Sequence, residues 1–176
     1  MQHTFSVLAE DRPGVLARLA GLVSRRGYNV SSLSVGQTER PGFSRFTLVV
    51  GAEETAVGQI VRQLEKLVET VDVRHLESGG MVERQLLLVK VRAPLELRAT
   101  VLQTAGIFRC RVVDMGRDAV VFELTGDRRK GRVFLEAMRP FGVLEAATSG
   151  AVALERVGFG EEAEGEAFVG ATAMTA

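Results

Sequence analysis

The sequence lacks net charge, paired cysteines and long apolar runs, and each absence excludes a class of protein. Its 22 basic and 22 acidic side chains cancel, which argues against a dedicated nucleic-acid binder, because such proteins carry a basic excess. The single cysteine, Cys110, cannot form an internal disulfide and fits a reducing compartment. No uninterrupted apolar run approaches the roughly 20 residues that span a bilayer, and no signal peptide is recognisable. We therefore expect a cytoplasmic protein that binds neither nucleic acid nor a membrane.

Motifs for catalysis and metal binding are also absent. No GxGxxG, Walker loop or nucleophile elbow occurs. His3 and His75 are far apart and lack nearby Cys or His partners, so metal ligation is not expected. Cys110 lies in an apolar stretch without an accompanying His–Asn pair, which is typical of a buried structural thiol. The basic cluster 128–130 opens an expected helix, where cations oppose the dipole, and indicates a solvated face, with phosphate binding as the alternative.

What the sequence has is an order of elements that occurs twice. Its 176 residues, of which 46% are hydrophobic, allow one or two small domains. Period-two and period-3.6 apolar patterns give strand, helix, strand, strand, helix, strand in each half. The expected elements are strands at 3–10, 28–37, around 46–50, and 71–76, with helices at 14–26 and 54–68, then strands at 84–92, 111–115, 119–124 and 142–148, with helices at 94–108 and 128–140.

Two βαββαβ units in tandem predict an α+β fold of two ferredoxin-like domains, each an antiparallel sheet covered on one face by two helices. The nearly continuous apolar strand at 84–92 further predicts burial on both of its faces. Open sheets leave exposed edges, and pairing with a second copy would cover them, so we expect a homodimer. The expected divisions are an N-terminal domain at 1–78, a linker at 79–82, a C-terminal domain at 83–157, and an acidic tail at 158–176 with the composition of a disordered segment.

The turn Asp11–Gly14 between the first strand and the first helix carries most of the functional information. Asp11 can cap the helix, Pro13 can preorganise its first turn, and Gly14 lets a ligand approach the backbone. Free N–H groups at a positive helix end suit a carboxylate, so the turn indicates a sensor for a small anion. A well-capped helix that binds nothing is the alternative. Asn29 is either a turn residue or a side-chain amide that contacts a ligand.

Over a longer span, EDRPGVLARLAGLVSRRGYNVSSLSV is similar to the N-terminal ACT domain of the acetolactate synthase (acetohydroxyacid synthase) regulatory small subunit. FSRFTLVV, QIVRQLEKLVETVDV and VERQLLLVKV resemble the same family, so the match covers residues 2 to about 157. The resemblance implies a non-catalytic subunit that binds and activates the thiamine-diphosphate-dependent catalytic subunit. It also implies feedback inhibition by a branched-chain amino acid, usually valine. No cofactor is expected in this chain, whereas thiamine diphosphate, Mg and FAD are expected on the catalytic subunit.

The resemblance also implies where an effector binds, namely at an interface between the ACT domains of a homodimer. The effector's carboxylate would meet backbone N–H groups at the start of the first helix, and Asn29 would come from the partner chain. The side chain of valine would rest against Leu16 and Val30. Asp11 stands where family members often have Asn, and its carboxylate can hold the effector's ammonium group. The expected effector-binding residues are Asp11, Gly14, Val15, Leu16, Asn29 and Val30.

Two other functions stay open. One is a stand-alone amino-acid-sensing ACT regulator of another enzyme or of transcription. The other is a small acylphosphatase-type hydrolase, which needs an Arg and an Asn around a phosphate loop that the sequence does not offer. The second half begins its helix with Ala93-Pro-Leu-Glu96 and has no counterpart of Gly14, so we expect no similar effector site there.

Overall fold

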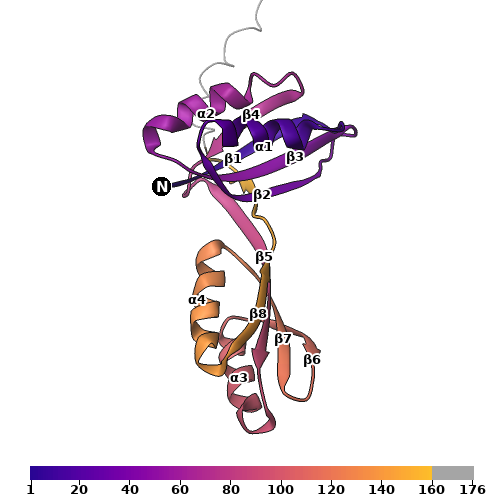
Figure 1. Cartoon of the computed structure of the whole chain (residues 1–176), viewed down its shortest axis with the longest axis vertical. Helices are drawn as coiled ribbons and strands as arrows, with labels where there is room; N and C mark the ends of the chain where they lie inside the picture. Colours follow the sequence, from indigo (N-terminus) through magenta and orange to yellow (C-terminus); the bar gives the residue numbers. More distant parts are fainter. Residues whose placement is uncertain (160–176) are drawn as a thin grey trace, which may run out of the picture.

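The computed structural model describes residues 1–159, which form two antiparallel sheets, each with its own pair of helices (Figure 1). The predicted pair of βαββαβ units is confirmed. The N-terminal half contains β1 (Gln2–Glu10), α1 (Val15–Arg25), β2 (Asn29–Gln37), β3 (Phe43–Gly51), a 3-10 turn (Glu54–Ala56), α2 (Val57–Leu64) and β4 (Thr70–Leu76). The C-terminal half contains β5 (Met81–Arg92), α3 (Leu95–Ile107), β6 (Arg111–Met115), β7 (Ala119–Gly126), α4 (Arg128–Met138), a 3-10 turn (Arg139–Phe141), β8 (Val143–Thr148) and β9 (Val152–Glu155). Most of the expected acidic tail lies outside the described residues.

The N-terminal sheet has the strand order β2-β3-β1-β4, and its core lies between one face and the two helices. Alternate residues of β1 and β3 point to that face, which matches the period of two in their sequences. Residues of α1 and α2 that are three or four positions apart pack against these strand residues, as the helical period requires. Burying each such side chain contributes about 1.5–3 kcal/mol. The buried cluster comprises Phe5, Val7, Ala9, Val15, Leu19, Val23, Phe46, Leu48, Val50, Ile60 and Leu64.

The C-terminal sheet has the order β6-β7-β5-β8 and is likewise covered by its helices on one face only. The prediction that β5 is buried on both faces is wrong. Leu87 is 2% exposed, whereas its neighbours Leu86 and Leu88 are each 38% exposed. The run of consecutive leucines hid the alternation, because both faces of the strand carry the same residue type.

Two helices differ from expectation. The helix expected at 54–68 begins as a 3-10 turn, and α2 ends at Leu64, so that Val68 is 95% exposed. The apolar spacing of the helix at 94–108 predicts that Leu97 faces inward, but its side chain is 42% exposed. It lies in the first turn of α3, and side chains lean toward a helix's N-terminus, where no earlier turn covers it. Val133 is also exposed, because it lies at the border of the apolar face of α4, whereas Phe134 on that face is fully buried.

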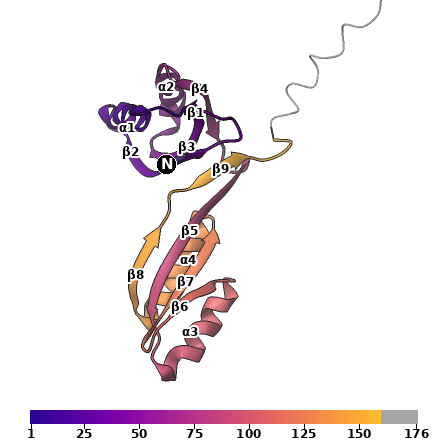
Figure 2. The ribbon, with the colours of Figure 1, turned by 90° about the vertical axis from the view of Figure 1, so that its right-hand side faces the viewer.

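One strand, β9, was not expected. It pairs antiparallel with the start of β5, matching Met81 with Glu155 and Arg84 with Val152. Of the segment 79–82, expected as a linker, the first two residues lie in a turn and the last two begin β5. The ribbon of β5 and β9 reaches the N-terminal sheet, where β9 lies beside β1 and β4 (Figure 2).

The ribbon lies on the helix-free face of the N-terminal sheet. That face presents Thr4, Ser6 and Val49, which are at most 5% exposed although no described helix covers them. Ala151 and Ala153, at and after the crossing point, are 0% and 1% exposed. The two halves are therefore packed together by a segment that the sequence places at the end of the second half.

Candidate functional site

The turn before α1 has a different cap from the one predicted. Gly14 is the N-cap residue, with φ of +86°, and no side chain accepts a hydrogen bond there. Asp11 was expected to cap the helix, but it is exposed, and its own backbone N–H donates to the Gly42 carbonyl at 2.9 Å. The helix begins four residues after Asp11, because Arg12 to Val15 form a tight turn closed by a 3.3 Å hydrogen bond. Pro13 thus lies in this turn and not in the first turn of the helix.

The start of α1 presents unpaired backbone donors. The Val15 N–H donates to the Arg12 carbonyl at 3.3 Å, and the Arg18 N–H donates to Gly14 at 3.0 Å. Within residues 1–159, the N–H groups of Gly14 and Leu16 have no backbone or side-chain acceptor. The first turn also contains no acidic side chain. This end of the helix can therefore receive an anion.

Sequence reasoning missed Arg18 at this turn. Its Nη1 lies 3.1 Å from the position that a Cβ on Gly14 would occupy. Its Nη2 pairs with Glu69 Oε1 at 2.6 Å, which holds the guanidinium over the turn. The helical spacing of four residues was a usable signal, because Arg18 and Gly14 share one face of the helix.

Asn29 does not lie near this turn in the same chain. It pairs with Gly51 of β3, which in turn pairs with Gln2 at the start of β1. The turn follows Glu10 at the other end of β1. At about 3.3 Å per residue, the two ends are separated by roughly 26 Å. One chain alone therefore does not bring all of the expected effector-binding residues together.

The apolar members of the expected site lie near the surface. Leu16 is 43% exposed, and Val30 is half-buried against the N-terminal core. Both belong to the side of the sheet where α1 packs against β2. β2 is an edge strand, so its outer backbone groups have no partner strand among the described residues.

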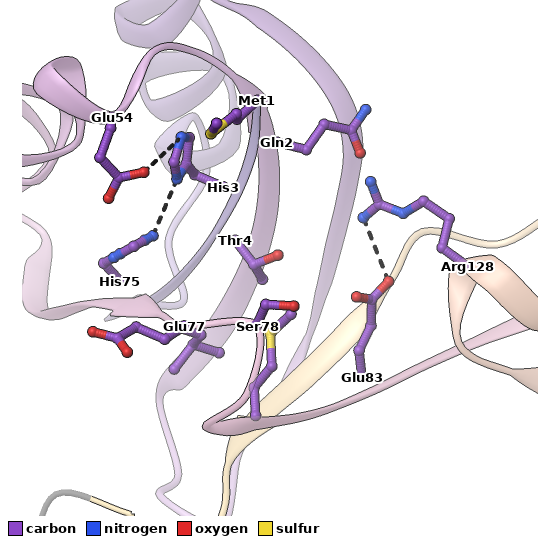
Figure 3. A pocket seen from close by; sticks show the side chains of 12 residues that line it. Met1, Gln2, His3, Thr4, Glu54, His75, Glu77, Ser78, Glu83 and Arg128 are labelled. Carbon is purple, nitrogen blue, oxygen red and sulfur yellow. Dashed lines mark hydrogen bonds and ion pairs between the residues drawn. The ribbon is translucent and has the colours of Figure 1, made fainter.

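His3 and His75 form a pair, so the expectation that they lack a His partner is wrong. The Nδ1 of His3 lies 3.4 Å from the Nε2 of His75 (Figure 3). β1 and β4 pair with Phe5 opposite His75, a register that no local pattern reveals. Burial, and then the neighbouring His3, lower the pKa of His75. In the described part of the chain, no three His, Cys, Asp or Glu side chains are grouped to hold a metal ion.

Two cavities lie where the halves meet. The first, about 620 Å³, adjoins the histidine pair, and Glu54, Glu77 and Glu83 line it (Figure 3). Arg128, expected on a solvated face, pairs across it with Glu83 at 3.4 Å. The second, about 540 Å³, has two arginines and several hydroxyl groups in its lining. It is lined by Gln2, Ser31, Ser32, Leu33, Gln85, Leu87, Arg128, Gly131, Arg132, Leu135, Thr148, Ser149 and Gly150.

Cys110 was expected to be buried, but it is only half-buried, just before β6. Burial nevertheless raises the pKa of its thiol to about 11, while Lys130 acts weakly in the opposite direction. A thiol with such a pKa is a poor nucleophile near neutral pH, because the thiolate is the reactive form.

Comparison with known proteins supports the two-part division of the chain. A family described as the AHAS small subunit-like ACT domain matches residues 5–72, and one described as the small subunit of acetolactate synthase matches residues 84–157. A probable acetolactate synthase small subunit from Archaeoglobus fulgidus is 47% identical over 156 residues, covering 89% of this chain and 98% of that protein. This chain belongs to the acetolactate synthase small-subunit family.

Other members of the acetolactate synthase small-subunit family agree in length and fold. The small subunit from Mycobacterium leprae is 47% identical over 154 residues, covering 88% of this chain and 91% of that protein. The crystal structure of the small subunit from Thermotoga maritima superimposes with a TM-score of 0.82 at 37% identity, covering 89% and 98% of the two chains. The predicted resemblance to the acetolactate synthase small subunit is thus confirmed. None of the described helices is long and apolar enough to cross a membrane.

Proposed function

We propose that this chain is the regulatory subunit of acetolactate synthase, which activates the catalytic subunit and makes it sensitive to valine. Relatives of matching length carry the name acetolactate synthase small subunit, which supports a catalytic partner. In this proposal, thiamine diphosphate, Mg and FAD belong to that partner. The complex works in the cytoplasm, and this chain contributes no reacting group. The observation that supports valine binding is the helix start with unpaired N–H groups, which lies beside the edge strand β2.

The carboxylate of valine binds at the start of α1. The unpaired N–H groups of Gly14 and Leu16 point out of the helix end, and the helix dipole adds a partial positive charge. An anion at such an end gains about 0.3–1 kcal/mol at the surface and up to about 2 kcal/mol where it is partly buried. The guanidinium of Arg18 lies beside the same turn. Asp11, just before the turn, is placed to hold the ammonium group.

A second copy of the chain completes the site. If two β2 strands pair antiparallel around Leu33, the partner subunit's Asn29 lies opposite Gln37. Gln37 pairs with Ser44, and Ser44 pairs with Ala9 near the end of β1. The partner's Asn29 then lies at the same end of the sheet as the start of α1. This arrangement removes the separation of roughly 26 Å within one chain and requires a homodimer.

The apolar contacts set the size of the effector. Leu16 and Val30 offer aliphatic surface at the proposed interface. Each buried methylene contributes about 0.8 kcal/mol, so the two additional carbons of valine favour it over alanine by about 1.6 kcal/mol, or roughly 15-fold. Valine then inhibits by binding one arrangement of the dimer more tightly, since a ligand shifts an equilibrium only through unequal affinity.

Acetolactate formation by the purified catalytic subunit, with and without this chain and across a valine titration, tests the proposal. We expect activation that valine reverses. Gly14→Asp should keep the activation but abolish valine binding and inhibition, because a carboxylate would occupy the anion's place. Gly158→Asp is the control for an aspartate at a positive φ, since Gly158 has φ of +78°, follows β9 in the chain, and has no atom within 4 Å of an added Cβ.

The outcomes separate the parts of the proposal. Activation without inhibition would reject valine as the effector. Inhibition that survives Gly14→Asp would reject the helix start as its site. No activation at all would reject the subunit assignment and favour a stand-alone ACT regulator.

A further inference from the structure

The segment Ser149–Ala153, here named the strap, crosses from the C-terminal sheet to the N-terminal sheet (Figure 2). At its start it is tied to the C-terminal half. The Ser149 N–H donates to the Leu86 carbonyl at 2.8 Å, and the Leu86 N–H donates to Ser149 Oγ at 2.9 Å. Two residues later it is tied to the N-terminal half, because the Ala151 N–H donates to Ser32 Oγ at 2.9 Å.

Gly150, between these two anchors, touches the backbone of β2. A Cβ placed on Gly150 would lie 2.6 Å from the Leu33 carbonyl oxygen and 2.9 Å from its carbon, and it would also collide with Ser34 Oγ. A backbone carbonyl cannot rotate away as a side chain can. Gly150 does not have a positive φ. Close approach, and not backbone conformation, therefore requires glycine at this position.

The strap is short enough to transmit movement. Its anchors at Ser149 and Ala151 are two residues apart, and three extended residues span at most about 10 Å. Ala151 and Ala153 after the crossing are buried, and the segment continues into β9, which pairs with β5. A displacement of β2 at Ser32 and Leu33 must therefore break these contacts or move the strap.

We propose that the strap couples β2 to the C-terminal half, so that effector binding at the β2 edge changes the C-terminal sheet through Ser32, Leu33 and Gly150. This inference rests on the proposed function, which places the dimer contact on β2 and the effector between the start of α1 and the partner's β2. In this proposal the effector changes the position of β2, and the strap contacts the same strand at Ser32 and Leu33. Such coupling is measurable, because a variant that breaks it keeps its affinity for valine but loses part of the inhibition.

The first test uses the complex with the catalytic subunit and the variant Gly150→Ala. Gly106→Ala is the matched control, since no atom lies within 4 Å of a Cβ placed on Gly106. We expect Gly150→Ala to bind valine within threefold of the unmodified chain, as measured by calorimetry, while the maximal inhibition falls by at least half. The control should match the unmodified chain in both measurements. Full inhibition in Gly150→Ala, or loss of its valine binding, would overturn the coupling role.

The second test needs no substitution. Amide hydrogen exchange of the unmodified chain, with and without valine, should slow at least threefold in residues 149–155 as well as in β2. If valine slows exchange only within residues 1–78, the coupling role of the strap is rejected. An unmodified chain that neither activates nor responds to valine contradicts the proposed function itself. A responsive unmodified chain with an equally responsive Gly150→Ala variant contradicts the strap alone.

Discussion

Replacing Gly14 by alanine tests the geometry of the turn before α1. The φ of +86° lies in the left-handed region, where a side chain costs about 1–2 kcal/mol. Gly27, just after the same helix, has φ of +78° and no atom within 4 Å of an added Cβ. Gly27→Ala therefore measures the backbone cost alone. Gly14→Ala should cost the same amount plus a contribution from Arg18, whose Nη1 lies 3.1 Å from the added Cβ.

The additional contribution comes from displacing the ion pair of Arg18 with Glu69. The Arg18 side chain is 47% exposed and that of Glu69 18%, so the pair contributes on the order of 0.2–1 kcal/mol. We expect Gly14→Ala to lower the free energy of unfolding by about 0.5 kcal/mol more than Gly27→Ala does. For a chain of this size, each kcal/mol corresponds to about 2–4 °C in Tm.

Urea unfolding followed by circular dichroism, in the original and the Arg18→Ala backgrounds, provides the double-mutant cycle. The excess cost of Gly14→Ala should disappear when Arg18 is alanine. Equal costs for Gly14→Ala and Gly27→Ala in the original background would refute the argument. An excess cost of Gly14→Ala that persists in the Arg18→Ala background would also refute it, because the cause would then lie in the backbone.

Three further predictions concern the histidine pair, the thiol and the effector. Because the pKa of His75 is lowered, the unfolded chain takes up a proton there more readily than the folded one. His75 therefore favours folding fully above its ordinary pKa of about 6.5 and progressively less below it. Tm between pH 7.5 and 5 should fall less steeply in His75→Gln, and equal slopes would contradict this. With a pKa of about 11, Cys110 has a thiolate fraction roughly 300-fold below that of a free cysteine at pH 7.5. Its reaction with a disulfide reagent should be roughly 20-fold slower than that of free cysteine, because the more basic thiolate is intrinsically more nucleophilic and offsets part of this difference. A similar rate would refute the burial. Calorimetric titration should show alanine binding roughly 15-fold more weakly than valine, and equal affinities would exclude Leu16 and Val30 from the site.

The fold was predictable where the signal is local. Apolar periods of two and 3.6 located the repeated helices and strands, and the strand at Arg111–Met115 was predicted with its observed bounds. β9 was missed because its four residues form a strand only through pairing with β5, about 70 positions earlier. The end of α2 at Leu64 depends on how the following residues pack, which the apolar pattern to Val68 does not encode.

The candidate site was predictable in part for the same reason. The strand, turn and helix around Gly14 follow from adjacent residues, although Gly14 and not Asp11 is the cap. The pairing of His3 with His75 depends on the register of β1 against β4 and leaves no mark in either strand. Likewise, only the sheet register shows that Asn29 lies at the far end from the turn.

The position of β9 bears on how this protein can be divided and recombined. Residues 151–153 come at the end of the second half in sequence, yet they pack on the sheet of the first half. A fragment that stops at residue 78 would leave Thr4, Ser6 and Val49 uncovered on a broad sheet face, which favours aggregation. An exchange of sensory halves between relatives should therefore include the matching strap as a second, separate insert. The N-terminal sheet and the residues that cover it are therefore discontinuous in the sequence, although they are continuous in space.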